Sequence, residues 1–254
     1  MDTMLEKRAL AELDDPSRAL ELRQKIQSKP FLKRFYEEVY DRYKRCIDQT
    51  TDGGIVLELG SGAGFAKSCI PEIITTDVLS YDGIDKVVDA TKMPFQDESV
   101  RSIVMMNVFH HIPDVEAFLK EAQRVLKKGG RIFILDQNLG WISKPILKYA
   151  HHEPFNDQVE DWKFETTGPL SGANGALAWV VFFRDELKFK QKFPMLSVTK
   201  KLPHSPFRYW VSGGLKDWTL APGFLFGFWT FVDRALCRLS PKFGSFIDIE
   251  IVKQ

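Results

Sequence analysis

Glycine recurs at every second position in one stretch of the sequence, directly after a short apolar run. Gly60, Gly62 and Gly64 follow the run 54–59, and the acidic residue Glu58 stands just before them. Glycine permits a positive φ and lets a ligand approach the backbone closely, so such a loop is typical of a nucleotide-type cofactor site at a strand end. The spacing is GxGxG, and no Gly-Lys-Ser/Thr follows, which excludes a phosphate-binding P-loop. A tight strand-to-helix turn without a ligand is the alternative.

The next three apolar runs also end in polar residues, which are Asp77, Asp89 and Asn107 in chain order. The carboxyl ends of parallel strands meet at one edge of a sheet, where such sheets bind ligands, so we expect these residues near the glycine loop. An acid in the place of Asp77 can accept hydrogen bonds from the two ribose hydroxyls of an adenosine. Each residue alone could be a polar strand end, but the series together indicates a cofactor crevice.

Two adjacent histidines are candidates for proton transfer. His110 and His111 lie beside the predicted cofactor site, and the ordinary histidine pKa of about 6.5 suits a general base. We favour His111 over His110 for this role. In the alternative interpretation, one histidine packs under the following helix and the other caps it.

A second cluster of potential ligands is formed by His151, His152 and Glu153. It could be a base pair or a partial metal site, but we favour a loop of solvated polar residues. Two adjacent histidines do not easily face one ion, so we predict no metal.

Short apolar runs predict the strands that must position these residues. Strands alternate with helical segments, which indicates a parallel sheet with right-handed crossovers. The last strand alternates apolar and acidic residues, a pattern typical of a half-exposed antiparallel edge strand. The expected strands are 54–59, 73–77, 86–89, 102–107, 131–136, a sixth near 193–199, and 246–252.

Helical periodicity appears before and between these strands. Phe35, Val39, Tyr43 and Ile47 recur every four residues and form one apolar stripe. The segment 115–127 is predicted as an amphipathic helix that ends at Gly129-Gly130.

Composition limits the class of protein. The 254 residues carry 35 basic and 34 acidic side chains, which give a net charge of +1. This nearly neutral balance does not favour a nucleic-acid partner. Cys46, Cys69 and Cys237 lie far apart, which favours a reducing compartment over a disulfide framework. The charged N-terminus has no apolar core of a signal peptide, and no uncharged stretch reaches the ~18 residues of a membrane span. We therefore expect a cytoplasmic protein.

The segment from Val56 to Asp136 resembles the class I S-adenosylmethionine-dependent methyltransferases, in particular the group similar to quinone-biosynthesis C-methyltransferases. The residues that carry the resemblance are LELGSGAG, the strand end at Asp77, DATKMPFQDESV, NVFHHIPD and EAQRVLKKGGRIFILD. The fold expected with it is an α/β, Rossmann-like, seven-stranded mixed sheet of order 3-2-1-4-5-7-6 with helices on both faces.

The resemblance also implies how S-adenosylmethionine is bound. Glu58 and the loop Gly60, Ser61, Gly62 and Gly64 would surround the methionine moiety, and Asn107 would lie under the sulfonium.

The nucleoside would lie further along the same edge in this resemblance. Asp77, followed by Val78, would hold the ribose, and Asp89 would hold the adenine amino group beside Ala90. Only eleven residues separate Asp77 from Asp89, too few for the usual helix between these strands.

The C-terminal third is rich in aromatic residues, nine of which lie in 207–231, with basic residues on both sides. We favour a lid that closes an apolar pocket; the alternative is a surface that contacts a bilayer on its inner, cytoplasmic face or a lipid-linked substrate. The pieces HHEPF, GPLSGANGAL, FFRDELKF and RYWVSGG are similar to bacterial methyltransferases of envelope glycan or lipid synthesis.

We therefore expect a helical arm at 1–50, a cofactor-binding core at 51–140, and a C-terminal part at 141–254 that defines the substrate. The arm would cover the cofactor through Tyr36 or Tyr40. The expected reaction is methyl transfer from S-adenosylmethionine to a small or lipid-like acceptor. An NAD-linked oxidoreductase and a catalytically silent cofactor-binding protein remain as alternatives, and the oligomeric state stays open.

Overall fold

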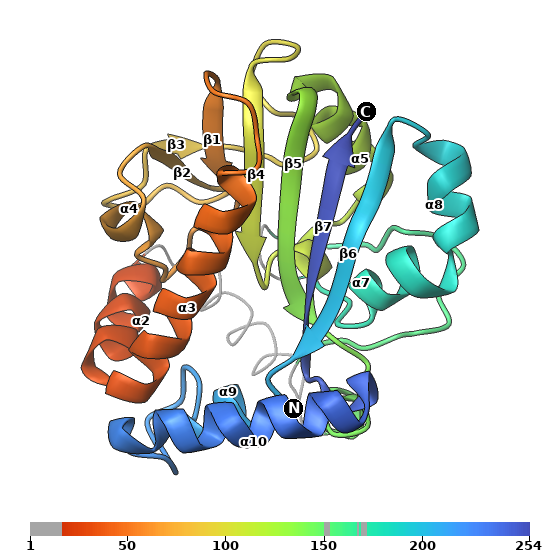
Figure 1. The fold of residues 1–254 in the computed structure, drawn as a ribbon. Coiled ribbons are helices and arrows are strands. Elements are labelled where there is room, and N and C mark those ends of the chain that lie inside the picture. The colour runs from red at the N-terminus through yellow and green to blue at the C-terminus, as the bar shows by residue number, and fades with distance from the viewer. Residues whose placement is uncertain (1–16, 150–152, 167, 169–171) are drawn as a thin grey trace, which may run out of the picture.

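Seven strands form one mixed sheet in the predicted order β3-β2-β1-β4-β5-β7-β6 (Figure 1). The computed structural model describes residues 17–149, 153–166, 168 and 172–254. β1 pairs in parallel with β2 and β4, β2 with β3, and β4 with β5, while β7 runs antiparallel to both β5 and β6. The strands are β1 Ile55–Glu58, β2 Ile73–Asp77, β3 Lys86–Val87, β4 Val100–Met106, β5 Leu126–Gln137, β6 Leu196–His204 and β7 Phe246–Lys253.

Helices cover both faces of this sheet, as expected. The longer ones are α2 Ser17–Ser28, α3 Pro30–Ile47, α5 Val115–Val125, α6 Ser143–Tyr149, α8 Glu186–Lys192 and α10 Phe226–Leu239. The short ones are α4 Ala66–Cys69, η1 Phe109–His111, α7 Leu177–Trp179, η2 Val180–Arg184, α9 Arg208–Val211, η3 Gly223–Leu225 and η4 Pro241–Phe243. Within the described residues, none of these helices has the length and apolar character needed to span a bilayer.

The helix α3 packs its predicted apolar stripe onto one face of the sheet. Phe35, Val39, Tyr43 and Ile47 are all buried, and Tyr43 contacts Phe133 of β5 edge to face. Burial of such a stripe is the main source of helix stability, because isolated helices of this length are marginal in water. The opposite face of the sheet is covered by α5 and by the helices between residues 177 and 192.

The predicted helix end at Gly129-Gly130 is wrong. The helix α5 ends at Val125, and Leu126 already has extended backbone and begins β5. Val100 of β4 pairs with Leu126, whereas Ser102 pairs with Arg131, so the intervening residues bulge out of the ladder. The glycines serve this bulge, where Gly129 has a φ of 76°. Other strand bounds differ as well: β3 is shorter than 86–89, β6 begins at Leu196 and continues to His204, and β1, β4, β5 and β7 differ from their predicted ranges at one or both ends.

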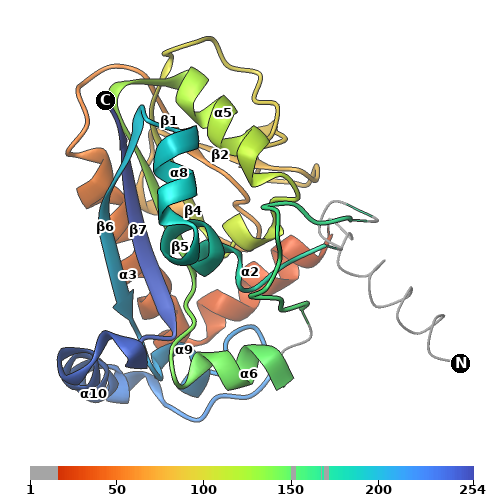
Figure 2. The same cartoon turned by 90° about the vertical axis from the view of Figure 1, so that its right-hand side faces the viewer.

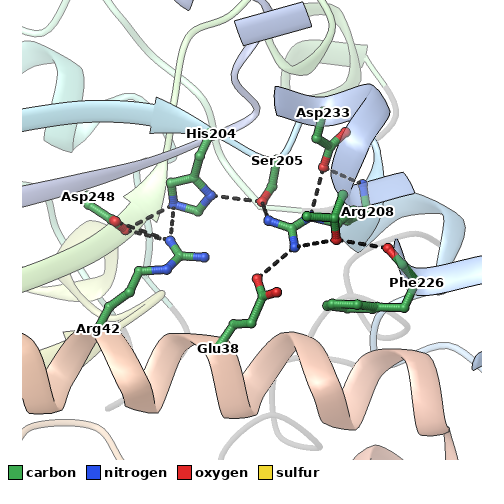
Figure 3. A network of polar contacts seen from close by, with 9 residues as sticks. Glu38, Arg42, His204, Ser205, Arg208, Phe226, Asp233 and Asp248 are labelled. Atoms are coloured by element: carbon green, nitrogen blue, oxygen red, sulfur yellow. Dashed lines mark hydrogen bonds and ion pairs between the residues drawn. The ribbon is translucent and has the colours of Figure 1, made fainter. Parts of the chain in front are cut away.

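The last strand is antiparallel, as predicted, but the expectation of a half-exposed edge strand is wrong. β7 lies between β5 and β6, and its acidic residues are buried. Arg42 of α3 donates to both carboxylate oxygens of Asp248, at 3.0 and 3.1 Å, and His204 lies 2.9 Å from Asp248 Oδ1 (Figure 3). Glu250 pairs with Lys200 at 2.7 Å. The alternation therefore reflects buried ion pairs, since buried charges require partners.

A second ion-pair cluster joins α3 to the C-terminal helices. Arg208 of α9 donates to Glu38 of α3 at 2.6 Å and to the buried Asp233 of α10 at 3.0 Å (Figure 3). Lys29, just before α3, donates to the carbonyl oxygens of Gly214 and Trp218 at 3.0 and 2.8 Å. The N-terminal helices and the residues after 207 are thus connected by charged groups as well as by apolar packing.

Candidate active site at the carboxyl ends of the parallel strands

The three glycines after β1 have different surroundings. A Cβ on Gly60 would lie 2.4 Å from a Val108 methyl group, and one on Gly64 would lie 2.8 Å from the Ser61 carbonyl oxygen, so close packing requires glycine at both positions. The nearest atom to a Cβ on Gly62 is the Gly60 carbonyl oxygen at 3.8 Å, although Gly62 has a φ of 47°. The loop therefore leaves space beside its middle glycine.

A buried carboxyl group lies directly below this loop. Glu58 ends β1 and accepts a hydrogen bond from the Ser61 hydroxyl at 2.7 Å. Burial raises the pKa of Glu58 to about 7, although the Ser61 hydrogen bond acts in the opposite direction. Glu58 can thus hold or release a proton near neutral pH.

Asp77 at the end of β2 closes the loop from the other side. Its Oδ2 accepts from the Gly62 N–H at 3.0 Å and from the Tyr81 hydroxyl at 2.9 Å, and its Oδ1 accepts from the Val78 N–H at 2.7 Å. Of these three donors, two are backbone N–H groups and the third is the Tyr81 hydroxyl. A ligand hydroxyl could therefore replace the Tyr81 hydroxyl on Asp77 without breaking the backbone hydrogen bonds. Arg23 of α2 also reaches the loop, at 3.4 Å from the Gly62 carbonyl oxygen.

Asp89, the third predicted acid, is exposed and holds its own turn. Its carboxylate accepts from the backbone and hydroxyl of Thr91, both at 2.7 Å, while Ala90 is partly buried. As the short spacing implied, no helix lies between β2 and β3, and Val78 in this segment is 40% exposed. The structure therefore brings Glu58, the glycines and Asp77 together, and Asp89 follows Val88, whose N–H donates to the Asp77 carbonyl oxygen at 2.8 Å, although the Asp89 carboxylate itself holds a turn.

Asn107 follows β4 in a left-handed conformation, with a φ of 53°. Its N–H donates to the Leu135 carbonyl oxygen at 2.8 Å, which fixes the backbone, and its side-chain oxygen is buried without a hydrogen-bond partner among the described residues. Such an unsatisfied acceptor costs free energy unless a ligand or water supplies a donor. Asn107 thus offers an acceptor at the same edge as the glycine loop.

His110 is completely enclosed between two carboxylates. Its Nδ1 lies 2.6 Å from Asp136 at the end of β5, and its Nε2 lies 3.3 Å from Glu153. Burial alone would lower the pKa of His110, but attraction to Asp136 and hydrogen bonds to both carboxylates raise it to about 10. His110 is therefore a cation at neutral pH and a poor proton acceptor.

His111 is partly exposed and oriented differently. Its Nδ1 lies 3.0 Å from the Gly172 carbonyl oxygen, which can only accept, so this nitrogen carries the hydrogen. Its Nε2 faces the second oxygen of Glu153 at 3.5 Å. Burial would raise the pKa of Glu153, but the contact with the cationic His110, and with His111 once it is protonated, holds that pKa well below its usual range. Glu153 is thus a carboxylate that can stabilise a proton taken up at His111.

The contact of Glu153 with the two histidines was not predicted, because Glu153 was expected in a loop of solvated polar residues. His151 and His152, the other members of that expected cluster, lie outside the described residues. The ligand atoms of His110, His111 and Glu153 lie within 4.8 Å of one another, so these three residues could hold a metal ion. However, the two imidazole rings are 4.2 Å apart and tilted by 41°, and each Nε2 faces a different oxygen of Glu153. Glu153 thus contacts both Nε2 atoms, at 3.3 Å for His110 and 3.5 Å for His111.

The aromatic residues of segment 207–231 divide into a buried group and an exposed group. Tyr209 packs against Phe35 and Phe246, and the buried Phe226 contacts Phe31, so these rings belong to the core over α3. Other rings of the segment point outward, and Phe224 is 82% exposed. The segment is therefore neither wholly a lid nor wholly an exposed surface.

The site as a whole fits a polar cofactor that carries hydroxyl groups. The space beside Gly62, the unsatisfied oxygen of Asn107 and the replaceable donor on Asp77 all lie at the carboxyl ends of the parallel strands. Gly60 packs on Val108, two residues before His110, which links the glycine loop to the histidines.

Comparison with known proteins identifies the central part of the chain. Residues 57–134 match the family model described as "Methyltransferase domain". This segment is a methyltransferase domain. The match confirms the family expected from sequence, the class I S-adenosylmethionine-dependent methyltransferases, and agrees with the strand order of the sheet.

The chain is also similar to curated proteins. It is 35% identical, over 87 residues, to the ubiquinone/menaquinone biosynthesis C-methyltransferase UbiE of Caulobacter sp. (strain K31), covering 34% of this chain and 29% of that protein. It is 27% identical, over 122 residues, to the uncharacterized methyltransferase YcgJ of Bacillus subtilis (strain 168), covering 41% and 44% of the two chains. The chain thus spans less than half the length of these curated relatives.

One similar solved structure is the geranyl diphosphate C-methyltransferase from Streptomyces coelicolor A3(2), with 13% identity and a TM-score of 0.46. The similarity covers 87% of this chain and 80% of that chain. At this TM-score we draw no conclusion from the likeness.

Proposed function

We propose that this protein transfers a methyl group from S-adenosylmethionine to a small-molecule or lipid-like acceptor. The observation that carries the proposal is the glycine loop between two acids, Glu58 and Asp77, inside a methyltransferase domain. When bound, S-adenosylmethionine supplies a methyl group on a sulfonium, ready for in-line displacement. Aligning the acceptor behind that methyl group is the main task of the protein, and such alignment contributes ~7–11 kcal/mol.

The residues around the loop have distinct roles in this proposal. Glu58, Ser61 and the loop glycines hold the methionine moiety, and Asn107 offers its unsatisfied oxygen beside it. Asp77 holds the ribose, whose hydroxyl replaces that of Tyr81 on Oδ2. The adenine is lined by Val78, Asp89 and Ala90. This part of the proposal rests on the resemblance, since in the structure the Asp89 carboxylate accepts hydrogen bonds only within its own turn.

His111 is the general base of the proposed reaction where the acceptor must lose a proton. The Gly172 carbonyl oxygen fixes the hydrogen on Nδ1, which leaves Nε2 as the acceptor, and Glu153 stabilises the resulting imidazolium. His110, already a cation, is a positioning residue that holds Glu153 against His111.

The acceptor class is the finer part of the proposal. A UbiE relative acts, by its name, in ubiquinone and menaquinone biosynthesis, which supports a quinone-type or envelope-lipid acceptor here. An acceptor of that kind is apolar, so the proposal includes contact between part of 207–231 and the inner, cytoplasmic face of a membrane. We propose no metal and no nucleic-acid partner for this reaction.

Cofactor binding is the first test. Calorimetry should detect S-adenosylmethionine binding to the wild-type protein, a loss of at least roughly tenfold in Asp77→Asn, and little change in Tyr81→Phe or in the surface control Asp97→Asn. Binding of NAD and not of S-adenosylmethionine would instead support the oxidoreductase alternative.

Methyl transfer is the second test. The protein is incubated with methyl-labelled S-adenosylmethionine and a cell extract, and label is counted in the organic, aqueous and protein fractions. Label that requires Asp77 in the organic or aqueous fraction supports the proposal. Tight cofactor binding with no label in any fraction would support a catalytically silent protein.

The base is tested once an acceptor fraction is known. His111→Asn should lower kcat by ~10²–10⁴ with an unchanged KM for S-adenosylmethionine, as expected for a lost proton acceptor. Dialysis against EDTA should leave the rate unchanged. A loss of activity that added Mg²⁺ or Zn²⁺ restores would contradict the metal-free reaction.

A further inference from the structure

One end of the molecule presents exposed aromatic side chains on a helix. Phe224, Phe228 and Phe231 recur at intervals of four and three residues in η3 and α10, and their exposed fractions are 82%, 57% and 71%. The opposite side of α10 is buried through Phe226 and Asp233. The outward face of this helix therefore has apolar residues that no described residue covers.

Neighbouring elements extend the same face. Trp141, before α6, contacts Phe243 of η4 at 5.1 Å between ring centroids, and is itself 59% exposed. Figure 2 shows α6, α9 and α10 at one end of the molecule. Six large aromatic side chains are exposed among the described residues, and all of them lie in α6, η3 or α10 or in the loop before one of these helices. They are Trp141, Tyr149, Trp218, Phe224, Phe228 and Phe231.

The charge of this face has one sign. Asp233 is the single acidic residue between positions 218 and 245, and it is buried against Arg208. Arg234, Arg238 and Lys242 are exposed on the second half of α10 and the turn that follows. The face therefore combines exposed aromatic rings with cationic groups and no exposed carboxylate in this segment.

We propose that this aromatic and basic face, formed by α10, η4 and the start of α6, binds the surface of an anionic bilayer. Aromatic residues favour the interfacial zone of a membrane, and Arg and Lys beside them pair with anionic headgroups. Contiguous exposed apolar patches of this kind are unusual on monomeric proteins without a binding role. A second copy of the chain fits less well, because its own basic groups would oppose these.

The position of the face suits a lipid-like acceptor, a point that rests on the proposed function. Asn138, directly after β5, donates to the Gly244 carbonyl oxygen at 2.7 Å, which connects the end of β5 to the turn after α10. The carboxyl end of β5 and α10 lie at the same end of the molecule (Figure 1). An apolar molecule in the bilayer would therefore meet the protein at the end that carries the site.

Vesicle flotation tests the surface independently of catalysis, since no cofactor or acceptor is present. The wild-type protein should float with phosphatidylcholine vesicles that contain phosphatidylglycerol, and less with phosphatidylcholine alone. The double variant Phe228→Ser/Phe231→Ser should bind at least roughly tenfold more weakly. Arg234→Gln/Arg238→Gln should lose the preference for anionic vesicles, and high salt should mimic it.

Leu187→Ser is the matched control, because Leu187 is 74% exposed on α8, another part of the surface. It should float like the wild type, and circular dichroism should show all variants folded. Absence of flotation with either vesicle, or equal loss in Leu187→Ser, would overturn the proposal. A dimer in light scattering that Phe228→Ser/Phe231→Ser converts to a monomer would show that a second copy covers this face.

Discussion

Gly62 and Gly129 both have a left-handed backbone conformation, but they lie in different surroundings. Both have positive φ, 47° and 76°, and neither would bring a Cβ closer than 3.8 Å to another atom. Gly62 faces the space proposed for the cofactor, whereas Gly129 lies in the bulge at the start of β5. The pair therefore separates the free energy of backbone strain from that of ligand contact.

We predict that Gly62→Ala and Gly129→Ala each lower the free energy of unfolding by about 1–2 kcal/mol, the usual cost of a left-handed non-glycine residue. Only Gly62→Ala should weaken S-adenosylmethionine binding, by at least roughly tenfold, because its methyl group enters the space beside the loop. Urea unfolding and calorimetry measure the two effects. Equal affinities in the two variants would place the cofactor elsewhere.

Glu58 should make stability depend on pH. Its pKa in the folded protein, about 7, lies above the ordinary 4.5, so folding favours the protonated form. The stability that this group contributes is therefore fully present below about 4.5 and is lost as the pH rises through 7. We predict that Glu58→Gln gains roughly 2–3 kcal/mol relative to wild type between pH 5 and pH 8, by urea unfolding. A constant difference between the two proteins would contradict this.

The site residues that could be predicted from the sequence are those that lie at the end of a predicted strand. Glu58, Asp77 and Asn107 each end or follow a strand of one parallel sheet, so their meeting needs only the strand order. Glu153 lies 43 positions after His110, beyond α5, β5 and α6, and outside any helix or strand, so no periodicity in the sequence predicts that the two residues meet. The contact between Glu153 and the two histidines could therefore be recognised only in the structure.

At the scale of elements, α3 is attached to the sheet by charge as well as by apolar packing. Arg42 reaches Asp248, whose carboxylate is fully buried, and the attraction of His204 and Arg42 lowers the pKa of Asp248 to about 2 against the effect of burial. Removing one partner of a buried pair leaves an uncompensated charge and costs about 3–5 kcal/mol.

We predict a loss of that size for Arg42→Met in urea unfolding. Lys33→Met on the same helix removes an exposed pair with Glu37, at 3.8 Å, and should change stability by less than about 0.5 kcal/mol. Comparable losses in the two variants would mean that the buried pair contributes no more than a surface one.

The same ion pairs explain why β7 was expected at the edge. Alternating acids in a strand normally face water, and the nearby basic residue Lys253 pairs with Glu98 and not with Asp248 or Glu250. Their partners come from α3, β5 and β6, which approach only in the folded chain. The pattern predicted the direction of the strand, and the strand order implied by the resemblance placed it between β5 and β6, but neither predicted that its acids are buried.

At the scale of the molecule, the two apolar cores are each built from distant parts of the chain. Phe109 contacts Phe182 at 5.2 Å on one face of the sheet, and Phe31 contacts Phe226 at 4.9 Å on the other. The residues before and after 140 therefore complete one another, which is consistent with the three segments forming one domain.

We predict a single cooperative unfolding transition. All six tryptophans follow residue 140, whereas α2, α3 and α5 precede it, so tryptophan fluorescence and far-ultraviolet circular dichroism report different parts of the chain. Their urea curves should superimpose. A fluorescence transition at lower urea would show that the C-terminal part unfolds on its own.

The interior place of β7 has a consequence for biosynthesis. Among the described residues, β6 is bonded to the sheet through β7 alone, and β7 ends at Lys253. While the chain emerges from a ribosome, β1 to β5 can pair as they appear, but β6 has no partner until residues 246–253 have left the exit tunnel. Throughout that interval both β5 and β6 present open edges, to which a strand of another chain could pair until β7 is inserted between them.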